Sequence, residues 1–266
     1  RSIPTSPLHA FSSPAPGTGK TLIVDAVSMI ATGKPAAVIS QGESEEETEK
    51  RLHTALLQGD AVVNIDNVDR PIRGDTLCQM LTQTVLRVRI LGKSQSMDCP
   101  STATVFATGN NLVIAGDMAR RALLCRLDAH CEKPEERQFD RNIYDHIRAN
   151  RAELVKAGLI LLREYQAQSC PDQKLKPMGS FEVWSEWVRG ALVWAGYSDP
   201  YMTRTRILEA DPVLATVRNL FHAWHGAFGE LSTTIKDSIA EAQNNPTLRE
   251  AVESIANTKT GINSRV

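Results

Sequence analysis

The chain has 266 residues, room for one large domain or two smaller ones, and its apolar (42%) and charged (23%) fractions are those of an ordinary folded protein. Its 30 Lys and Arg nearly balance its 31 Asp and Glu, and the net charge of −1 argues against a broad basic surface that coats nucleic acid. No apolar run approaches the roughly 18 residues that a membrane span requires, so we expect no membrane partner and a cytoplasmic location. The sequence begins with Arg, and we expect it to be a module of a longer protein.

Short apolar runs alternate with amphipathic stretches in the first half of the chain, which is typical of a parallel α/β sheet. We expect strands at residues 8–12, 36–40, 61–66, 85–91 and 102–108. The helices of this half are expected at residues 21–32, 43–58 and 75–83, the first two closed by Gly33 and Gly59. Beyond about residue 131 helical periodicity takes over, with helices expected at 139–168, 181–195, 214–228, 234–242 and 246–255.

The strongest motif is the glycine-rich segment at residues 14–21, PAPGTGKT, between the first strand and the first helix. Its glycines allow backbone conformations that point N–H groups at a phosphate, and the helix N-terminus adds partial positive charge. Lys20 is expected to bind the β and γ phosphates and the Thr21 hydroxyl to bind Mg²⁺. Position 14 is proline where the usual pattern has glycine, a departure at the entry of the loop. The residues expected to contact ATP are Pro16, Gly17, Thr18, Gly19, Lys20, Thr21 and Leu22.

Asp66, at the end of the third expected strand, is the carboxylate expected to hold Mg²⁺ together with Thr21. Many ATPases follow this aspartate with a glutamate that activates water, whereas Asn67 follows it here. An amide orients water but does not accept its proton, so either hydrolysis is slow or the base lies elsewhere. The acidic residues 43–49 are a candidate source. The interpretation that we favour is that they stabilise a helix N-terminus and face solvent.

Polar and basic residues follow in a set order. The next strand ends in Asn110-Asn111, and Asp117 and Arg120-Arg121 come before a further apolar stretch. With the glycine-rich loop and its carboxylate, this order resembles the core of the AAA+ ATPases. The resemblance implies that Asn110 or Asn111 is the sensor-one residue that positions water, and that Arg121 or Arg120 is an arginine finger completing a neighbouring subunit's site. The alternatives for these arginines are solvation and an ion pair with Asp117.

A finer resemblance covers most of the chain. It is similar to the ATPase modules of phage and mobile-element primase–helicases, which are superfamily-three-like replicative helicases. In that family the Asp-Asn pair at positions 66 and 67 is familiar. The segments that carry the resemblance are IDNV (65–68), ATGNN (107–111) and RRA (120–122) and, in the helical part, FEVWS (181–185) and WAGYSDP (194–200).

The predicted fold is therefore α/β, a P-loop NTPase (AAA+-like) parallel sheet followed by an all-helical C-terminal region. We expect a nucleotide-binding core at residues 1–130, a helical lid at 131–229 and a helical tail at 230–266. The tail is compatible with an incomplete helix-turn-helix or winged-helix element, and equally with an ordinary helical hairpin.

The stretch before the sensor strand is a candidate DNA contact. In related helicases a hairpin at this place carries a lysine to the DNA backbone. Arg87 and Arg89 alternate and are expected to share one strand face, with Lys93 near the tip. Such phosphate contacts would give salt-dependent affinity without sequence preference. The alternative, weighted equally, is a solvated edge strand protected by basic residues.

Five cysteines stand at positions 78, 99, 125, 131 and 170. Their spacing fits neither a Cys-x-x-Cys pair nor a zinc site with histidines. We interpret them as buried free thiols of a reducing compartment.

The leading hypothesis is an ATP- and Mg²⁺-dependent motor that assembles as a homo-oligomeric ring, expected to be a hexamer. It would act on single-stranded or forked DNA as the helicase module of a phage or mobile-element replication protein. Asn67 and Asn110 would orient water, and Arg121 would reach the neighbour's γ-phosphate. The alternative is a nucleotide-gated assembly switch with little turnover. A P-loop kinase is a third option, which leaves the order of sensor and arginine unexplained. The sequence does not decide which helical arginine, such as Arg189, contacts the nucleotide.

Overall fold

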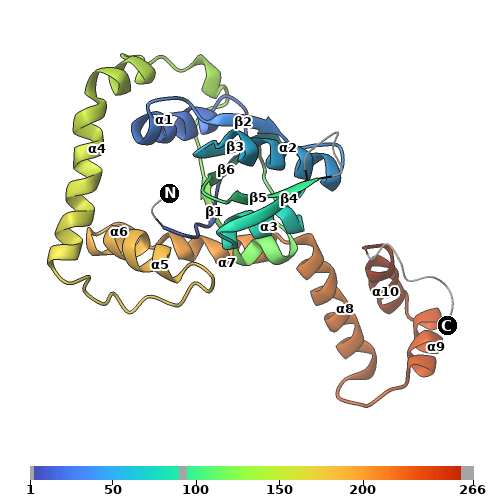
Figure 1. Ribbon diagram of the computed structural model, residues 1–266. Helices are drawn as coiled ribbons and strands as arrows, with labels where there is room; N and C mark the ends of the chain where they lie inside the picture. The colour runs from blue at the N-terminus through green and yellow to red at the C-terminus, as the bar shows by residue number, and fades with distance from the viewer. Residues whose placement is uncertain (1–2, 90–94, 259–266) are drawn as a thin grey trace. The chain divides into compact units, whose positions relative to one another are not determined.

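The computed structural model (Figure 1) describes residues 3–89 and 95–258. The chain divides into two compact units, Arg1–Thr205 and Arg206–Val266. Within the described ranges, every strand lies before residue 127 and the regular structure after residue 142 is helical. The functional division at residues 130 and 229 is not tested by these units and stays a prediction.

A five-stranded parallel sheet forms the centre of the first unit, which confirms the expected α/β class. Its order is β2-β3-β6-β1-β7, and each neighbouring pair runs parallel. The last strand was predicted only as an apolar stretch. The strands are β1 (Leu8–Ser13), β2 (Ala37–Ser40), β3 (Val62–Val68), β6 (Thr104–Asn110) and β7 (Ala122–Arg126).

A separate antiparallel hairpin joins β4 (Val85–Arg89) to β5 (Ser96–Pro100). Strand β5 was not predicted because its residues, SMDCP, lack the alternation of apolar and polar side chains that marks a strand. Leu86 and Val88 of β4 are buried, whereas their neighbours in the strand are exposed. The hairpin therefore has one face on the core and one in solvent.

Capping residues set the helix boundaries of the first unit. Gly33 and Gly59 end α1 and α2 in the left-handed region, as predicted. The second helix begins two residues later than predicted because Ser44 accepts a hydrogen bond from the Glu47 N–H. Asn142 likewise delays the start of α4. The helices are α1 (Lys20–Thr32), α2 (Glu45–Gln58), α3 (Asp75–Thr82), α4 (Ile143–Ala167), α5 (Glu182–Trp184) and α6 (Gly190–Trp194); shorter turns are η1 (Gly116–Arg120), η2 (Pro134–Glu136), η3 (Ser185–Arg189) and η4 (Pro200–Thr203).

The long helix α4 is fastened to α1, the helix that follows the glycine-rich loop (Figure 1). The Tyr144 hydroxyl donates to Asp25 Oδ2 at 3.0 Å. Arg151 donates from Nε to Met29 O at 3.0 Å and from Nη2 to Ala31 O at 3.1 Å, so it satisfies carbonyls at the C-terminal end of α1. These contacts hold α1 in place behind the glycine-rich loop that precedes it.

The imidazole of His9, in β1, packs between aromatic rings, 5.3 Å from the Phe106 ring and 5.9 Å from the Trp184 ring. Desolvation by these neighbours lowers the pKa of His9 to about 4 from an ordinary 6.5. The ring is therefore neutral at pH 7 and resists protonation in the folded state.

This shift makes folding stability depend on pH. The unfolded chain protonates His9 below pH 6.5 and the folded chain does not, so stability is complete above that pH and is lost as the pH falls towards 4. We expect the free energy of unfolding, from urea titrations, to fall by about 2 kcal/mol between pH 7 and pH 5 through this group. His9→Gln should remove that component, whereas substitution of the exposed His130 should not change it.

The second unit is helical in its described part. The ring of Trp224 lies 5.0 Å from that of Phe228, and Leu248 and Ala251 of α10 are buried against α8. Both alternatives for this tail, an incomplete helix-turn-helix or winged-helix element and an ordinary helical hairpin, stay open. The helices are α7 (Arg204–Ala210), which begins in the first unit, α8 (Pro212–Phe228), α9 (Ile235–Asn244) and α10 (Pro246–Thr258).

The cysteines are less buried than predicted. Cys78 and Cys99 are buried, but Cys125 and Cys131 are exposed and Cys170 is half-buried. The prediction that all are buried thiols is therefore wrong. In the ranges 3–89 and 95–258, no group of three or more His, Cys, Asp or Glu side chains is placed to hold a metal ion. The helices of the same ranges include none whose length and apolarity would let it cross a membrane.

Candidate functional site

The carboxyl ends of β1 and β6 meet at Lys20, the first residue of α1. Its ammonium donates to Asn110 Oδ1 at 2.8 Å, to Ser13 Oγ at 2.5 Å and to Thr18 Oγ1 at 3.2 Å. Desolvation lowers the pKa of Lys20, and the nearby charge of Asp66 opposes part of that shift. The lysine is thus a partly dehydrated cation among oxygen acceptors, at the edge where parallel sheets place ligands.

Thr21 connects the same helix to β3. Its hydroxyl donates to Asp66 Oδ1 at 3.0 Å, and Thr108 of β6 donates to the same carboxylate oxygen. Asn64, fully buried beneath them, donates to Thr108 at 3.2 Å. The network fixes the orientation of Asp66 relative to the helix N-terminus. It thereby brings together two oxygen-bearing side chains of the type that Mg²⁺ takes in proteins.

The strand β3 is irregular at this point. Its pairing with β6 shifts register between Ile65 and Val68, and Asn67 adopts a left-handed conformation with φ of 51°. Gly109 of β6 allows the close approach, because a Cβ there would lie 2.4 Å from the Val68 carbonyl oxygen. A bulge of this kind re-aims side chains at a strand end. Here it leaves Asp66 half-buried and Asn67 exposed at the edge of the site.

Residues 16–22 form the loop and the first turn of α1. Gly17 and Gly19 both have positive φ (71° and 94°), the conformation for which glycine was expected. Thr18 is buried, whereas Pro16 and Leu22 are exposed. The structure therefore places Lys20 with Asn110 and Thr21 with Asp66 at the carboxyl ends of the strands, with the loop beside them. Of the two asparagines considered for the sensor position, it is Asn110 that contacts Lys20.

Sequence reasoning missed four residues of this neighbourhood. Ser13 and Thr108 are strand residues that hold Lys20 and Asp66, and their place at strand ends was the available signal. Glu135 and Arg137 belong to a segment more than a hundred positions away. Arg137 donates from Nη2 to Thr18 O at 3.2 Å, and Glu135 lies directly against Gly17. No local sequence pattern predicts such a tertiary contact.

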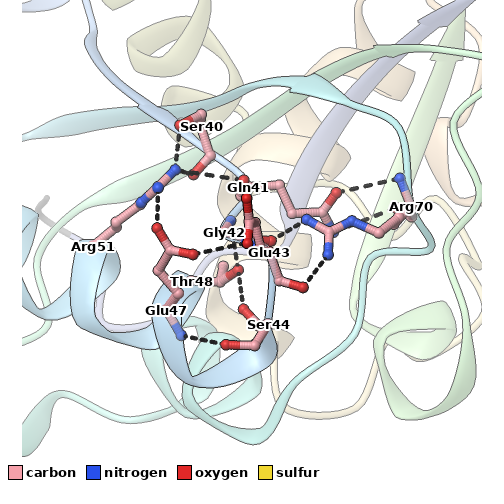
Figure 2. A network of polar contacts seen from close by, with 9 residues as sticks. All are labelled: Ser40, Gln41, Gly42, Glu43, Ser44, Glu47, Thr48, Arg51 and Arg70. Carbon is pink, nitrogen blue, oxygen red and sulfur yellow. Dashed lines mark hydrogen bonds and ion pairs between the residues drawn. The ribbon is translucent and has the colours of Figure 1, made fainter.

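Two arginines secure the loop that follows β2, as Figure 2 shows. Arg51 binds Ser40 O at 3.0 Å and pairs with Glu47. Arg70, from the loop after β3, donates to the carbonyls of Gly42 and Glu43. The loops after two adjacent strands are therefore tied together beside the site.

The acidic segment 43–49 takes part in helix capping and ion pairs. Glu47 accepts from the Glu43 N–H at 2.9 Å, and this bond and Arg51 hold the pKa of the Glu47 carboxyl below its usual range. Glu46 pairs with Lys50 at 2.7 Å. These contacts confirm the interpretation of acids that stabilise a helix N-terminus.

Arg120 and Arg121 lie at the opposite edge of the sheet. The Arg121 carbonyl accepts from the Leu8 N–H, at the amino end of β1, whereas the Lys20 network is at the carboxyl end, about 16 Å further along the strand. Both arginines pair with Asp117, so the ion pair considered above is present. The side chain of Arg121 is 11% exposed and that of Arg120 is 47% exposed. Neither arginine is placed to act on the Lys20 site of its own chain.

The candidate DNA-contacting residues lie on the hairpin. Arg87 and Arg89 share its exposed face, as predicted from their spacing. Arg87 pairs across the strands with Asp98, Nε to Oδ1 at 2.9 Å, and this hydrogen bond, together with the Asp98 charge, raises the pKa of Arg87. Lys93 lies outside the described residues. The pairing with Asp98 reduces the net positive charge on this face, and the DNA contact stays a prediction.

Arg189 is not available to a nucleotide. Its side chain is fully buried and makes a double contact with Asp199, 2.7 Å from Nε to Oδ1 and 2.7 Å from Nη2 to Oδ2. It also donates to Lys176 O at 2.7 Å and lies 4.7 Å from the ring centroid of Tyr201. The guanidinium therefore makes its contacts within the core of its own unit.

Comparison with protein-family models gives no match, and no curated protein matches the sequence. Among solved structures, the chain is similar to "The A form apo structure of NrS-1 C terminal region-CTR", with a TM-score of 0.48 and 15% identity. A second structure of that region, CTR(305-718), gives 0.45 and 15%. Each match covers 98% of this chain and 60% of the other, so the chain spans less than two thirds of those chains.

Proposed function

We propose that the chain is a P-loop NTPase that binds ATP with Mg²⁺ at the carboxyl ends of β1, β3 and β6. The observation that carries this proposal is that Lys20 contacts Asn110 and Thr21 contacts Asp66, so that four polar side chains from two strands and a helix lie together. A glycine-rich loop with positive φ at Gly17 and Gly19 adjoins them. An ammonium, a helix N-terminus and backbone N–H groups all favour a polyanion here.

The donor set fits a magnesium–triphosphate. Thr21 and Asp66 offer hydroxyl and carboxylate oxygens, the ligands that Mg²⁺ prefers. When bound, the ion would neutralise phosphate charge and orient the phosphoryl group for transfer. Thr108 and Asn64 keep the Asp66 carboxylate oriented towards Thr21. Lys20 would exchange its contacts with Ser13 and Asn110 for phosphate oxygens.

Among the residues that the structure describes, the site lacks an evident general base to activate the attacking water. Asn67 and Asn110 would orient the attacking water through their amides, and neither accepts its proton. The glutamates of the second helix are engaged in capping and ion pairs, as described above. We therefore propose slow intrinsic turnover that depends on a further contribution to the transition state.

That contribution would come from a second subunit. An arginine at the amino edge of the sheet is too far from the nucleotide site of its own chain and would act at the site of a neighbouring subunit. In a ring, such an arginine stabilises the charge on the transferred phosphoryl group. We assign this role to Arg120, whose side chain is far more exposed than that of Arg121. A homo-oligomeric ring acting on DNA, the helicase module inferred from the sequence, is the activity proposed for such an assembly.

Turnover with and without single-stranded DNA tests this proposal. We expect slow Mg²⁺-dependent ATP hydrolysis that single-stranded DNA stimulates several-fold, together with nucleotide-dependent assembly in sedimentation experiments. Asp66→Ala should abolish the activity and so exclude a contaminating ATPase. Assembly with a non-hydrolysable analogue but without turnover would favour the alternative, a nucleotide-gated switch, which Asn67 supports. Absence of nucleotide binding would refute both.

A further inference from the structure

The segment 134–139 lies against the glycine-rich loop. A Cβ on Gly17 would stand 2.9 Å from Glu135 Cβ and 3.0 Å from its backbone nitrogen, so the two segments are in direct contact. Arg137 donates from Nη2 to Thr18 O at 3.2 Å and from Nε to Pro134 O at 2.9 Å. These contacts fix the segment to the backbone of the proposed phosphate site.

A large aromatic side chain follows directly. Phe139 is 72% exposed, yet its ring centroid lies only 5.4 Å from the guanidinium carbon of Arg137. The arginine thus connects this ring to the loop, by a cation–π contact on one side and a hydrogen bond to Thr18 on the other. An exposed phenyl ring gains nothing from water. Its exposure here, beside a proposed nucleotide site, points to a ligand with a flat apolar surface.

The charges beside the loop indicate which part of a nucleotide belongs near each residue. Lys20 attracts phosphate beside Asn110. Beside Gly17, the Glu135 carboxylate stands 3.1 Å from the position that a Cβ on this glycine would take. A carboxylate repels phosphate and accepts hydrogen bonds from sugar hydroxyls. The neighbourhood of Glu135 therefore suits the uncharged nucleoside half of the molecule.

We propose that Phe139 is the surface on which the nucleobase of the bound triphosphate stacks, with Arg137 as the residue that positions it. This inference rests on the proposed nucleotide site. A phenyl ring offers no hydrogen bond to phosphate but stacks on any base, because every base has a π-face. Phe139 therefore contributes to the affinity for the nucleoside and not to that for the phosphate chain.

Calorimetry with two ligands separates these contributions. ATP and inorganic tripolyphosphate, each with Mg²⁺, are titrated into the wild-type chain, Phe139→Ala and Phe139→Tyr. We expect the alanine variant to lose about tenfold or more in ATP affinity and to bind tripolyphosphate within about twofold of wild type. Tyrosine should restore ATP binding. Phe221→Ala is the matched control, since Phe221 is 68% exposed and belongs to the other unit.

Each remaining outcome counts against the inference. Equal losses for both ligands would show that Phe139 supports the loop and does not stack. Unchanged ATP binding by Phe139→Ala, or wild-type binding of tripolyphosphate as tight as that of ATP, would overturn it while leaving the phosphate site intact. A wild-type chain that binds neither ligand would instead overturn the proposed function itself.

Discussion

Lys20→Ala is expected to reduce the affinity for Mg²⁺-ATP by about a hundredfold or more, because it removes the cation that meets the terminal phosphates. The same ammonium is partly desolvated, so its loss should cost little folding stability. Isothermal titration gives the affinity directly. Thermal unfolding gives a second measure, since a ligand that binds only the folded state stabilises it by about 2.7 kcal/mol at a hundred times its Kd. That stabilisation should disappear in the variant.

Lys34→Ala is the matched control for this experiment. Lys34 lies just beyond the other end of the same helix, its side chain is 69% exposed, and its ammonium lies 4.0 Å from the Asp60 carboxylate. It should bind Mg²⁺-ATP like the wild type. A Lys20→Ala chain that keeps wild-type affinity would show that the network at the strand ends has another purpose. A chain that fails to fold would contradict the expectation that this lysine is dispensable for stability.

The sequence predicted the strand ends of this site well, for a physical reason. Parallel strands bring their carboxyl ends to one edge, so a glycine-rich loop after β1 and a carboxylate at the end of β3 must be neighbours once the strand pattern is recognised. Thr21 and Asp66 meet at 3.0 Å as that logic requires. The choice of Asn110 over Asn111 followed only from the structure, because a shift of one position at a strand end reverses the direction of the side chain.

Contacts made across long sequence separations could not be predicted. Arg137 contacts Thr18 although 119 positions separate them, and its neighbourhood in the sequence resembles an ordinary polar loop. Arg189 illustrates a question that the sequence left open. A basic residue on a helix was considered for a nucleotide contact, whereas the structure buries it against Asp199. Periodicity locates the apolar face of a helix, but it does not reveal when a charged residue on that helix has a buried partner.

Arg189→Ala is expected to lower the free energy of unfolding of the first unit by about 3–5 kcal/mol, the cost of breaking a buried ion pair. The change leaves the Asp199 carboxylate without its main partner. Desolvation disfavours ionisation of that carboxyl, but Arg189 and the Tyr201 N–H outweigh it and hold its pKa below the usual range. Asp199 also caps η4, whose Thr203 accepts a hydrogen bond from the Leu124 N–H of β7 at 3.1 Å. Loss of this cap should therefore also weaken the contact between η4 and strand β7 at the edge of the sheet.

Urea unfolding of Arg189→Ala, compared with Arg163→Ala, measures this effect. Arg163 also pairs with a carboxylate, Glu164 at 2.7 Å, but both side chains are exposed (75% and 45%), so its loss should cost less than about 1 kcal/mol. Replacing both partners, with Arg189→Met and Asp199→Leu, should recover part of the stability, since no charge then stays buried alone. ATP titration at low temperature, where Arg189→Ala is still folded, separates structure from ligand binding. Wild-type affinity there agrees with a buried structural arginine, whereas a stable variant with weakened ATP binding would place Arg189 at the nucleotide after all.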